Sequence, residues 1–268
     1  MNKKSQPQGD IEKKGVPGEG IWLDHIAVAV RNIEVSADYY RTLGYRCGEI
    51  VIDPRQGSKL LMCKKPNCIS IELVAPAQDQ SPIHRILSTN GDWPYHLCYR
   101  VKDVAGFLTS MEQQGITFKT VSDLKPAVLF DNKKVMFIKV IHVGLVELLE
   151  DKPANYQWQE QEKVKQNAVR IVIDRPGPPV NFYKHLGYQH VKDIHTEKQL
   201  EIIMKKPGAG EIELVVPLQE TLKENEFLNN NGPHVYQLCF EEGAVDEAAL
   251  KCGDMMVDYM CIRKKLPH

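Results

Sequence analysis

The sequence lacks the features that would assign it to a membrane, secreted or nucleic-acid-binding class. It contains no long uninterrupted apolar run, so we expect neither a signal peptide nor a membrane span. Its 34 Lys and Arg residues nearly balance its 35 Asp and Glu residues, so no strong field of one sign exists to attract nucleic acid or an anionic lipid surface. We therefore expect a cytoplasmic protein that acts on a small-molecule substrate and binds neither nucleic acid nor membrane.

The cysteines do not form a recognisable framework either. All seven lie outside CxxC pairs, and their spacing is not that of a secreted disulfide scaffold. Cysteines of a reducing cytoplasm remain thiols, buried or half-buried in the fold. We therefore expect free cysteines.

The length of 268 residues and the apolar content of 43% are ordinary for a folded chain of about two domains. The beginning of the chain is the exception, because residues 1–20 are polar and rich in Lys, Gly and Pro. We expect this segment to be a disordered tail.

An internal repeat organises the rest of the chain. Residues 64–66 (KKP) and 71–74 (IELV) return at 205–207 and 212–215, and both are displaced by 141 positions, since 205 − 64 and 212 − 71 give the same value. A shared offset of this kind indicates duplication. The predicted domains are a first domain at 21–151, a linker at 152–165 and a degenerate, incomplete second copy at 166–268.

A shorter structural unit occurs twice within the first copy. A strand around His25, a helix and strands ending at Glu72 are followed by a strand around His96, a helix and strands ending at Glu147. Each helix begins after a capping residue, Asn32 or Asp103, and ends before a glycine. The pattern predicts an α+β fold of paired βαβββ modules with small mixed sheets.

Four polar residues occupy equivalent places in these modules: His25, Glu72, His96 and Glu147. A single histidine on an apolar strand is usually a core residue, and a single glutamate usually faces solvent. The run GLVELLE around Glu147, however, would leave a buried carboxylate that needs a partner. Two imidazoles and two carboxylates suit one divalent transition metal (Co, Mn, Ni, Zn or Fe). Such an ion stabilises charge on a carbonyl oxygen when the neighbouring carbon loses a proton, which predicts enolisation chemistry.

The segments DHIAVAV, IELVAP, YHLCYRV and GLVELLE resemble the four ligand strands of the vicinal oxygen chelate superfamily (glyoxalase, bleomycin resistance protein and dioxygenase). Within it, SPIHRIL at 81–87, the turn at 54–57 and KKVMFI at 133–138 resemble methylmalonyl-CoA epimerases most. The resemblance implies a cup-shaped mixed sheet and a metal-dependent epimerase or isomerase acting on an acyl thioester, such as an acyl-CoA, or on a 2-oxo compound. It also implies that His25, Glu72, His96 and Glu147 are the metal ligands.

The sequence departs from the epimerase pattern at two positions. Arg55 stands where epimerases commonly carry an acid, and Leu60 lies where some of them place a carboxylate proposed as a base. One base is therefore easier to assign than two. The catalytic candidates are Glu147 and Glu72, with a pKa that apolar surroundings would raise.

Other functions remain open at this point. A glyoxalase I-like lyase would use the same metal and the same enolate. A metal-free binding or resistance protein would have no need of the quartet. An interaction protein would explain only the degenerate copy. In that copy Ala168, Glu213 and Gln237 stand opposite His25, Glu72 and His96, and the place of Glu147 is expected beyond the end of the chain. We expect no metal there. Exposed strand edges of the unfinished module make a homodimer one expectation.

Overall fold

The structure is a computed structural model that describes residues 18–151, 167–245 and 259–263. The predicted linker and nearly all of the predicted tail lie outside these residues. Among the residues described, no helix is both long and apolar enough to cross a membrane.

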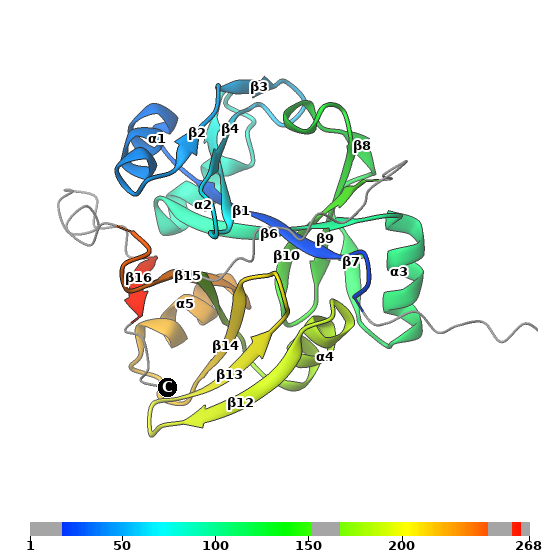
Figure 1. Cartoon of the computed structure of the whole chain (residues 1–268), viewed down its shortest axis with the longest axis vertical. Helices are drawn as coiled ribbons and strands as arrows, with labels where there is room; N and C mark the ends of the chain where they lie inside the picture. The colour runs from blue at the N-terminus through cyan, green and yellow to red at the C-terminus, as the bar shows by residue number, and fades with distance from the viewer. Residues whose placement is uncertain (1–17, 152–166, 246–258, 264–268) are drawn as a thin grey trace, which may run out of the picture.

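The described chain forms two sheets with helices between their strands (Figure 1). The first copy contains β1 (Trp22–Ala29), α1 (Ile33–Thr42), β2 (Arg46–Cys47), β3 (Val51–Asp53), β4 (Ser58–Lys64), β5 (Ser70–Pro76), α2 (Ile83–Asn90), β6 (Trp93–Val101), α3 (Val104–Gln113), β7 (Phe118–Thr120), β8 (Lys125–Pro126), the 3-10 turn η1 (Val128–Phe130), β9 (Lys134–Val140) and β10 (Gly144–Glu150). The second contains β11 (Asn167–Val172), α4 (Gly177–His185), β12 (Gln189–His195), β13 (Gln199–Lys205), β14 (Glu211–Pro217), α5 (Lys223–Asn231), β15 (His234–Glu241) and β16 (Met260–Arg263).

The first sheet has the order β2-β4-β5-β1-β6-β10-β9-β7, with β3 paired to β4 and β8 paired to β9. Strand β1 runs parallel to β5 and antiparallel to β6, and β6 runs parallel to β10. Two βαβββ modules thus meet along β1 and β6. The predicted α+β fold with paired modules is confirmed.

The second sheet repeats half of this arrangement. Its order is β12-β13-β14-β11-β15-β16, with β11 parallel to β14 and antiparallel to β15. Strand β16 lies parallel beside β15, as β10 lies beside β6. Among the described residues, no counterparts of β7, β8 and β9 intervene. In its described part, the unfinished module therefore keeps the strand equivalent to β10.

This register corrects one prediction. Glu147 is paired with Cys98, and at the equivalent place Cys261 is paired with Cys239. The place of Glu147 is thus occupied by Cys261 and does not lie beyond the end of the chain. The error arose because the sequence offset assumed a module of full length.

Helices α1 and α3 of the first copy begin as predicted. The Asn32 side chain accepts a hydrogen bond from the amide of Val35 at 3.0 Å, and the Asp103 side chain accepts one from Ala105 at 3.2 Å. Each satisfies an amide that the first helical turn leaves without a partner.

One apolar core joins the two copies. It contains Ile26 and Val28 of β1 together with Val169 and Ile171 of β11, all nearly inaccessible to solvent. Alternation along each strand sends these residues to one face and leaves the other face for the cup. At the junction the side-chain amide of Asn90 donates to Asn231 at 2.8 Å, and these residues are separated by 141 positions, the offset of the repeat. The two copies therefore meet in a nearly symmetric way.

The expectation of free cysteines is wrong for four of the seven. Disulfides join Cys47 to Cys63 across β2 and β4, and Cys239 to Cys261 across β15 and β16. The partners are 16 and 22 positions apart in sequence, so only strand pairing brings them together. Cys68 and Cys98 are buried and form no disulfide among the described residues, and Cys252 lies outside those residues.

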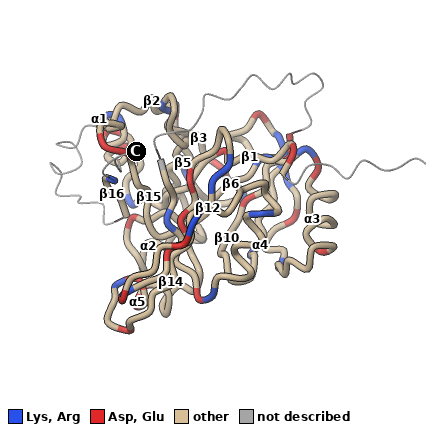
Figure 2. Tube along the Cα trace, turned by 60° about the horizontal axis from the view of Figure 1, so that its bottom comes forward, with Lys and Arg blue, Asp and Glu red and all other residues tan. Residues whose placement is uncertain are grey.

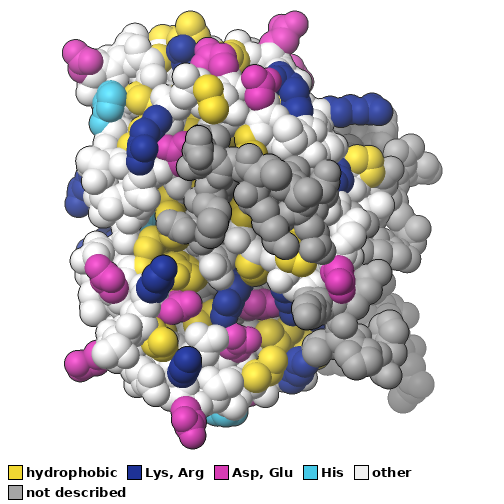
Figure 3. Space-filling model, turned by 90° about the vertical axis from the view of Figure 1, so that its left-hand side faces the viewer, with side chains coloured by type: hydrophobic (Ala, Val, Ile, Leu, Met, Phe, Trp, Pro, Cys, Tyr) yellow, Lys and Arg dark blue, Asp and Glu magenta, His cyan; other side chains and the backbone are white. Residues whose placement is uncertain are grey.

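Charges of both signs are spread over both sheets, as Figure 2 shows. On the side of the molecule that carries α1 and β16, hydrophobic side chains lie in small groups among charged ones (Figure 3). The described surface therefore agrees with the balanced composition of the chain.

Candidate metal centre

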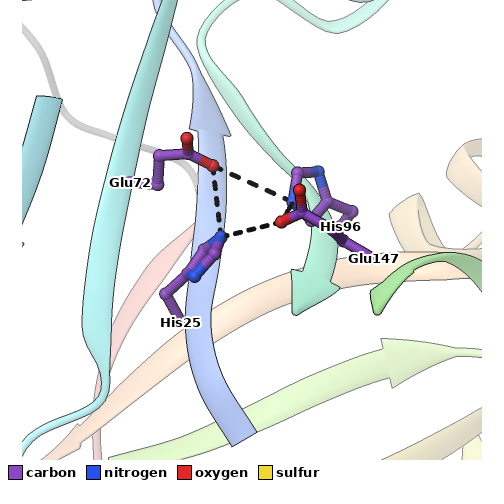
Figure 4. Close-up of side chains that lie close together, drawn as sticks. All are labelled: His25, Glu72, His96 and Glu147. Carbon is purple, nitrogen blue, oxygen red and sulfur yellow. Dashed lines mark hydrogen bonds and ion pairs between the residues drawn. The ribbon is translucent and has the colours of Figure 1, made fainter. Parts of the chain in front are cut away.

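The four predicted ligands point toward one another from neighbouring strands of the first sheet (Figure 4). His25 comes from β1, Glu72 from β5, His96 from β6 and Glu147 from β10. One potential ligand atom of each lies within 4.8 Å of the others. The small residue Ala27 pairs with both Glu72 and His96 and leaves the space between them open.

The quartet is almost completely buried, with exposed fractions between 0% for His25 and 4% for Glu72. The Nε2 atom of His25 lies 3.1 Å from Glu72 Oε2 and 3.3 Å from Glu147 Oε2. The Nε2 atom of His96 lies 3.3 Å from the same Glu147 oxygen and 3.9 Å from Glu72 Oε2. Two buried carboxylates at this separation need positive charge between them.

The electrostatics of the quartet correct a second prediction. Burial raises the pKa of Glu147, but the imidazoles of His25 and His96 lower it more, so this pKa lies well below its usual range. Burial lowers the pKa of His25, while its contacts with Cys98, Asp24 and Glu147 raise it well above the usual value. The expected rise in the pKa of Glu147 is therefore wrong, because the ligand imidazoles outweigh the apolar surroundings.

The outer nitrogen of His25 has a carboxylate partner. Its Nδ1 lies 3.0 Å from Asp24 Oδ1, and Arg100 Nε donates to Asp24 Oδ2 at 2.8 Å. Arg100 Nη1 also donates to Asp151 at 2.5 Å, and Lys133 joins Asp151 at 3.0 Å. This chain of charges fixes the ring so that Nε2 faces the other three ligands.

Aromatic rings enclose the quartet. Phe130 stacks on His25 with ring centroids 5.5 Å apart, and Tyr95 and Phe137 meet His96 edge-on at 4.5 and 5.1 Å. Sequence reasoning missed Phe130, Asp24 and Arg100. Only Asp24 carried a signal, since it directly precedes His25.

The structure also places the two residues at which the sequence departs from the epimerase pattern. Leu60 is buried in an apolar cluster of the cup wall, and Arg55 Nη1 donates to the carbonyl of Pro126 at 2.9 Å. Neither side chain supplies a carboxylate.

The residues fit a divalent cation. The Nε2 atom of His25 is buried, makes no aligned hydrogen bond to any described residue and points into the space that both carboxylates share. Four N and O donors of this kind suit a borderline divalent ion. No other cluster of three or more such ligands is found within the described ranges.

The equivalent place in the second sheet holds an arginine. Arg170 takes the pairing position of Ala27, opposite Glu213 and Gln237. Its guanidinium lies 3.4 Å from Glu213, 3.3 Å from Gln237 and 2.7 Å from Glu201. A fixed cation thus occupies the space that the first copy leaves open.

Known proteins resemble the first half of the chain in sequence. The profile described as "Glyoxalase/Bleomycin resistance protein/Dioxygenase superfamily" matches residues 24–137. The ethylmalonyl-CoA/methylmalonyl-CoA epimerase of Cereibacter sphaeroides is 32% identical over 130 residues, which cover 47% of this chain and 95% of that protein. The mitochondrial methylmalonyl-CoA epimerase of Mus musculus is 28% identical over 148 residues, 54% of this chain and 81% of the relative.

A solved structure resembles most of the fold. A mutant of 4-hydroxymandelate synthase from Streptomyces coelicolor matches with a TM-score of 0.59 over 86% of this chain and 73% of that chain. At 14% identity this likeness shows the fold alone. Its coverage extends over both sheets, whereas the epimerases match about half of the chain. Through this first half, the chain belongs to the glyoxalase/bleomycin resistance protein/dioxygenase superfamily.

Proposed function

We propose that the protein is a metal-dependent enolising enzyme, an epimerase or isomerase that acts on an acyl thioester such as an acyl-CoA. The observation that carries the proposal is the buried quartet of two imidazoles and two carboxylates. The curated relatives that are methylmalonyl-CoA epimerases support the substrate class.

His25, Glu72, His96 and Glu147 would hold one divalent ion, with Mn, Fe, Co, Ni and Zn as candidates. When bound, the ion supplies a Lewis acid that stabilises negative charge on the thioester oxygen. Asp24 keeps the Nε2 atom of His25 directed into the site. The aromatic walls keep water away, which strengthens every charge interaction inside.

The α-proton of the substrate would go to a carboxylate of the quartet, Glu72 or Glu147. The opposite wall offers Leu60 in place of an acid. Asp53 lines the neighbouring hollow of about 400 Å³, but its Oδ1 accepts the amide of Arg55 at 2.9 Å and is held in a turn. With a base on one face only, exchange of the α-proton with solvent should be faster than inversion of the stereocentre.

The test is deuterium incorporation into methylmalonyl-CoA by the metal-supplemented protein. Incorporation is expected to exceed epimerisation, and Glu72→Gln or Glu147→Gln should lower it by about 100-fold or more. Glu213→Gln alters the equivalent residue of the second copy and should leave it unchanged. Metal binding without incorporation would contradict the acyl-thioester assignment and favour a glyoxalase-type hemithioacetal substrate.

A further inference from the structure

Of the three rings that enclose the quartet, only that of Tyr95 carries a hydroxyl group. Tyr95 directly precedes His96 on β6, and neighbouring residues of a regular strand point to opposite faces of the sheet. The pairing of β6 with β1 is irregular here, because Ala27 pairs with His96 whereas the next residue, Val28, pairs with Pro94. This β-bulge allows the side chains of Tyr95 and His96 to reach the same side of the sheet.

Tyr95 stands between the quartet and the hollow of about 400 Å³. It is 6% exposed, and it lines this hollow together with Phe137. Both rings also meet His96 edge-on, at centroid distances of 4.5 Å for Tyr95 and 5.1 Å for Phe137. The Tyr95 hydroxyl interacts electrostatically with the carboxylates of Glu72 and Glu147. A substrate that extends from the hollow to the quartet therefore passes this hydroxyl.

The other polar side chains around the hollow already have partners in the protein. They are Gln56 and Asp53 (bonded to each other at 3.2 Å), Arg55 (to the carbonyl of Pro126 at 2.9 Å), Ser122 (to the amide of Phe137 at 2.9 Å), Lys125 and Asp123 (paired at 3.2 Å) and Gln80 (to Gln78). The hydroxyl of Tyr95 has no hydrogen-bond partner among the described residues. A buried hydroxyl without an acceptor is costly, so an acceptor atom of a bound ligand would complete this site.

The proposed chemistry supplies such an acceptor. Negative charge develops on the thioester oxygen when the α-proton of an acyl thioester leaves. A hydrogen bond from a neutral phenol to this oxygen strengthens as the charge grows. Apolar residues pack around Tyr95, among them Leu60, Val74 and Ile83, and such low-dielectric surroundings strengthen the bond further.

We propose that the Tyr95 hydroxyl donates a hydrogen bond to the thioester oxygen of the substrate and stabilises the enolate that forms there. Tyr95 is then a catalytic residue beside the four ligands. It neither gains nor loses a proton, since the α-proton goes to Glu72 or Glu147. The inference rests on the proposed function and adds to its site a residue that contacts the substrate.

The test compares the metal-loaded wild type with Tyr95→Phe and Tyr99→Phe. Tyr95→Phe removes one oxygen and keeps the ring that packs against His96. Tyr99→Phe is the matched control, because Tyr99 lies on the same strand but is buried in the large core. Both variants should retain the ion as the wild type does, because neither hydroxyl is a ligand.

Calorimetry measures the binding of two probes to each protein. A nitronate analogue of propionyl-CoA carries the delocalised negative charge of an enolate, whereas 2,2-dimethylmalonyl-CoA has no α-proton and reports binding of the ground state. Tyr95→Phe should weaken binding of the nitronate by about 100-fold and binding of the dimethyl compound by less than about threefold. Tyr99→Phe should change neither affinity.

Deuterium incorporation into methylmalonyl-CoA gives a second measurement. In Tyr95→Phe its kcat should fall by about 100-fold while KM changes by less than about threefold. Equal weakening of both probes, an unchanged affinity for the nitronate, or loss of the ion from Tyr95→Phe would overturn the role of Tyr95. A wild type that binds the nitronate no more tightly than Tyr95→Phe does would overturn this inference alone, whereas a loaded wild type that neither binds it nor exchanges deuterium would overturn the proposed function as well.

Discussion

His25 and His96 hold equivalent places in the two modules, yet their outer nitrogens have different surroundings. Asp24 partners His25 and is itself held by Arg100, whereas the buried Nδ1 of His96 makes no hydrogen bond within the described part of the chain. A metal-binding histidine is oriented by the partner of its second nitrogen. His25 is therefore the better fixed of the two proposed ligands.

Asp24→Asn should weaken metal retention by about 10- to 100-fold. The neutral amide oxygen accepts a weaker hydrogen bond from His25 Nδ1 than the carboxylate does, and the ion pair with Arg100 is lost. The measurement is the rate of zinc or cobalt loss to a chelator from the loaded protein. Asp38→Asn, which removes an exposed carboxylate on α1, is the control. Equal loss rates for both variants would contradict the role of Asp24.

At the residue scale the sequence allowed the quartet to be identified, because equivalent strands of two modules each carried one ligand type. It did not identify Phe130 or Arg100. The contact of Phe130 with His25 depends on how η1 folds over the quartet, and the contact of Arg100 depends on which face of β6 meets Asp24. Neither arrangement has a periodicity that a single sequence displays.

Arg170 performs in the second sheet the charge compensation that we assign to a metal in the first. Burial raises the pKa of Glu213, and Arg263 and Arg170 oppose that shift. The side chains of Arg170 and Glu213 are 17% and 5% exposed. An arginine that filled the cup would make the second copy independent of metal.

Arg170→Met should lower the free energy of unfolding by about 3 kcal/mol, because it leaves Glu201 and Glu213 with less compensating charge in a buried site. Urea denaturation measures the loss. Arg175→Met is the control, because Arg175 is 61% exposed beside Asp174 and should change stability by less than about 0.5 kcal/mol. A similar, small change in both variants would show that Arg170 is dispensable.

At the scale of elements, capping residues and strand alternation predicted the helices and the paired modules correctly. A strand was expected at 257–264, where β16 lies, but its pairing with β15 and the disulfides were not predicted. Both depend on strand pairing between distant segments, and the offset of the repeat carried no information about the shorter spacing between β15 and β16.

The two copies share one core, and titratable histidines lie where the copies meet. His185 of α4 lies 3.0 Å from the Ser110 hydroxyl of α3, and burial lowers its pKa from the usual 6.5. Burial likewise lowers the pKa of His234, at the start of β15. At these two histidines the unfolded chain therefore binds more protons than the folded chain once the pH falls below 6.5.

Stability at this junction should accordingly fall as the pH drops through and below 6.5, and be fully present above it. His185→Gln should reduce the acid-induced decrease in melting temperature. The same change at His195, an exposed residue of β12, should not. Identical pH profiles for the wild type and His185→Gln would contradict this account.

At the scale of the whole molecule, duplication was evident from the sequence, but the contact between the copies was not. The joint core and the Asn90–Asn231 bond show that the second copy packs against the first. This arrangement agrees with a second copy that covers the first domain.

The most direct test of the central claim is elemental analysis of the purified chain after loading with Mn, Co, Ni or Zn, beside His25→Ala, Glu147→Ala and Gln237→Ala. We predict about one ion per chain in the wild type and in Gln237→Ala, and loss of the ion in the other two variants. Gln237 is the matched control because it stands at the His96 position of the second copy. Full retention by His25→Ala and Glu147→Ala, or no ion in the wild type, would contradict the assignment of the quartet as a metal centre.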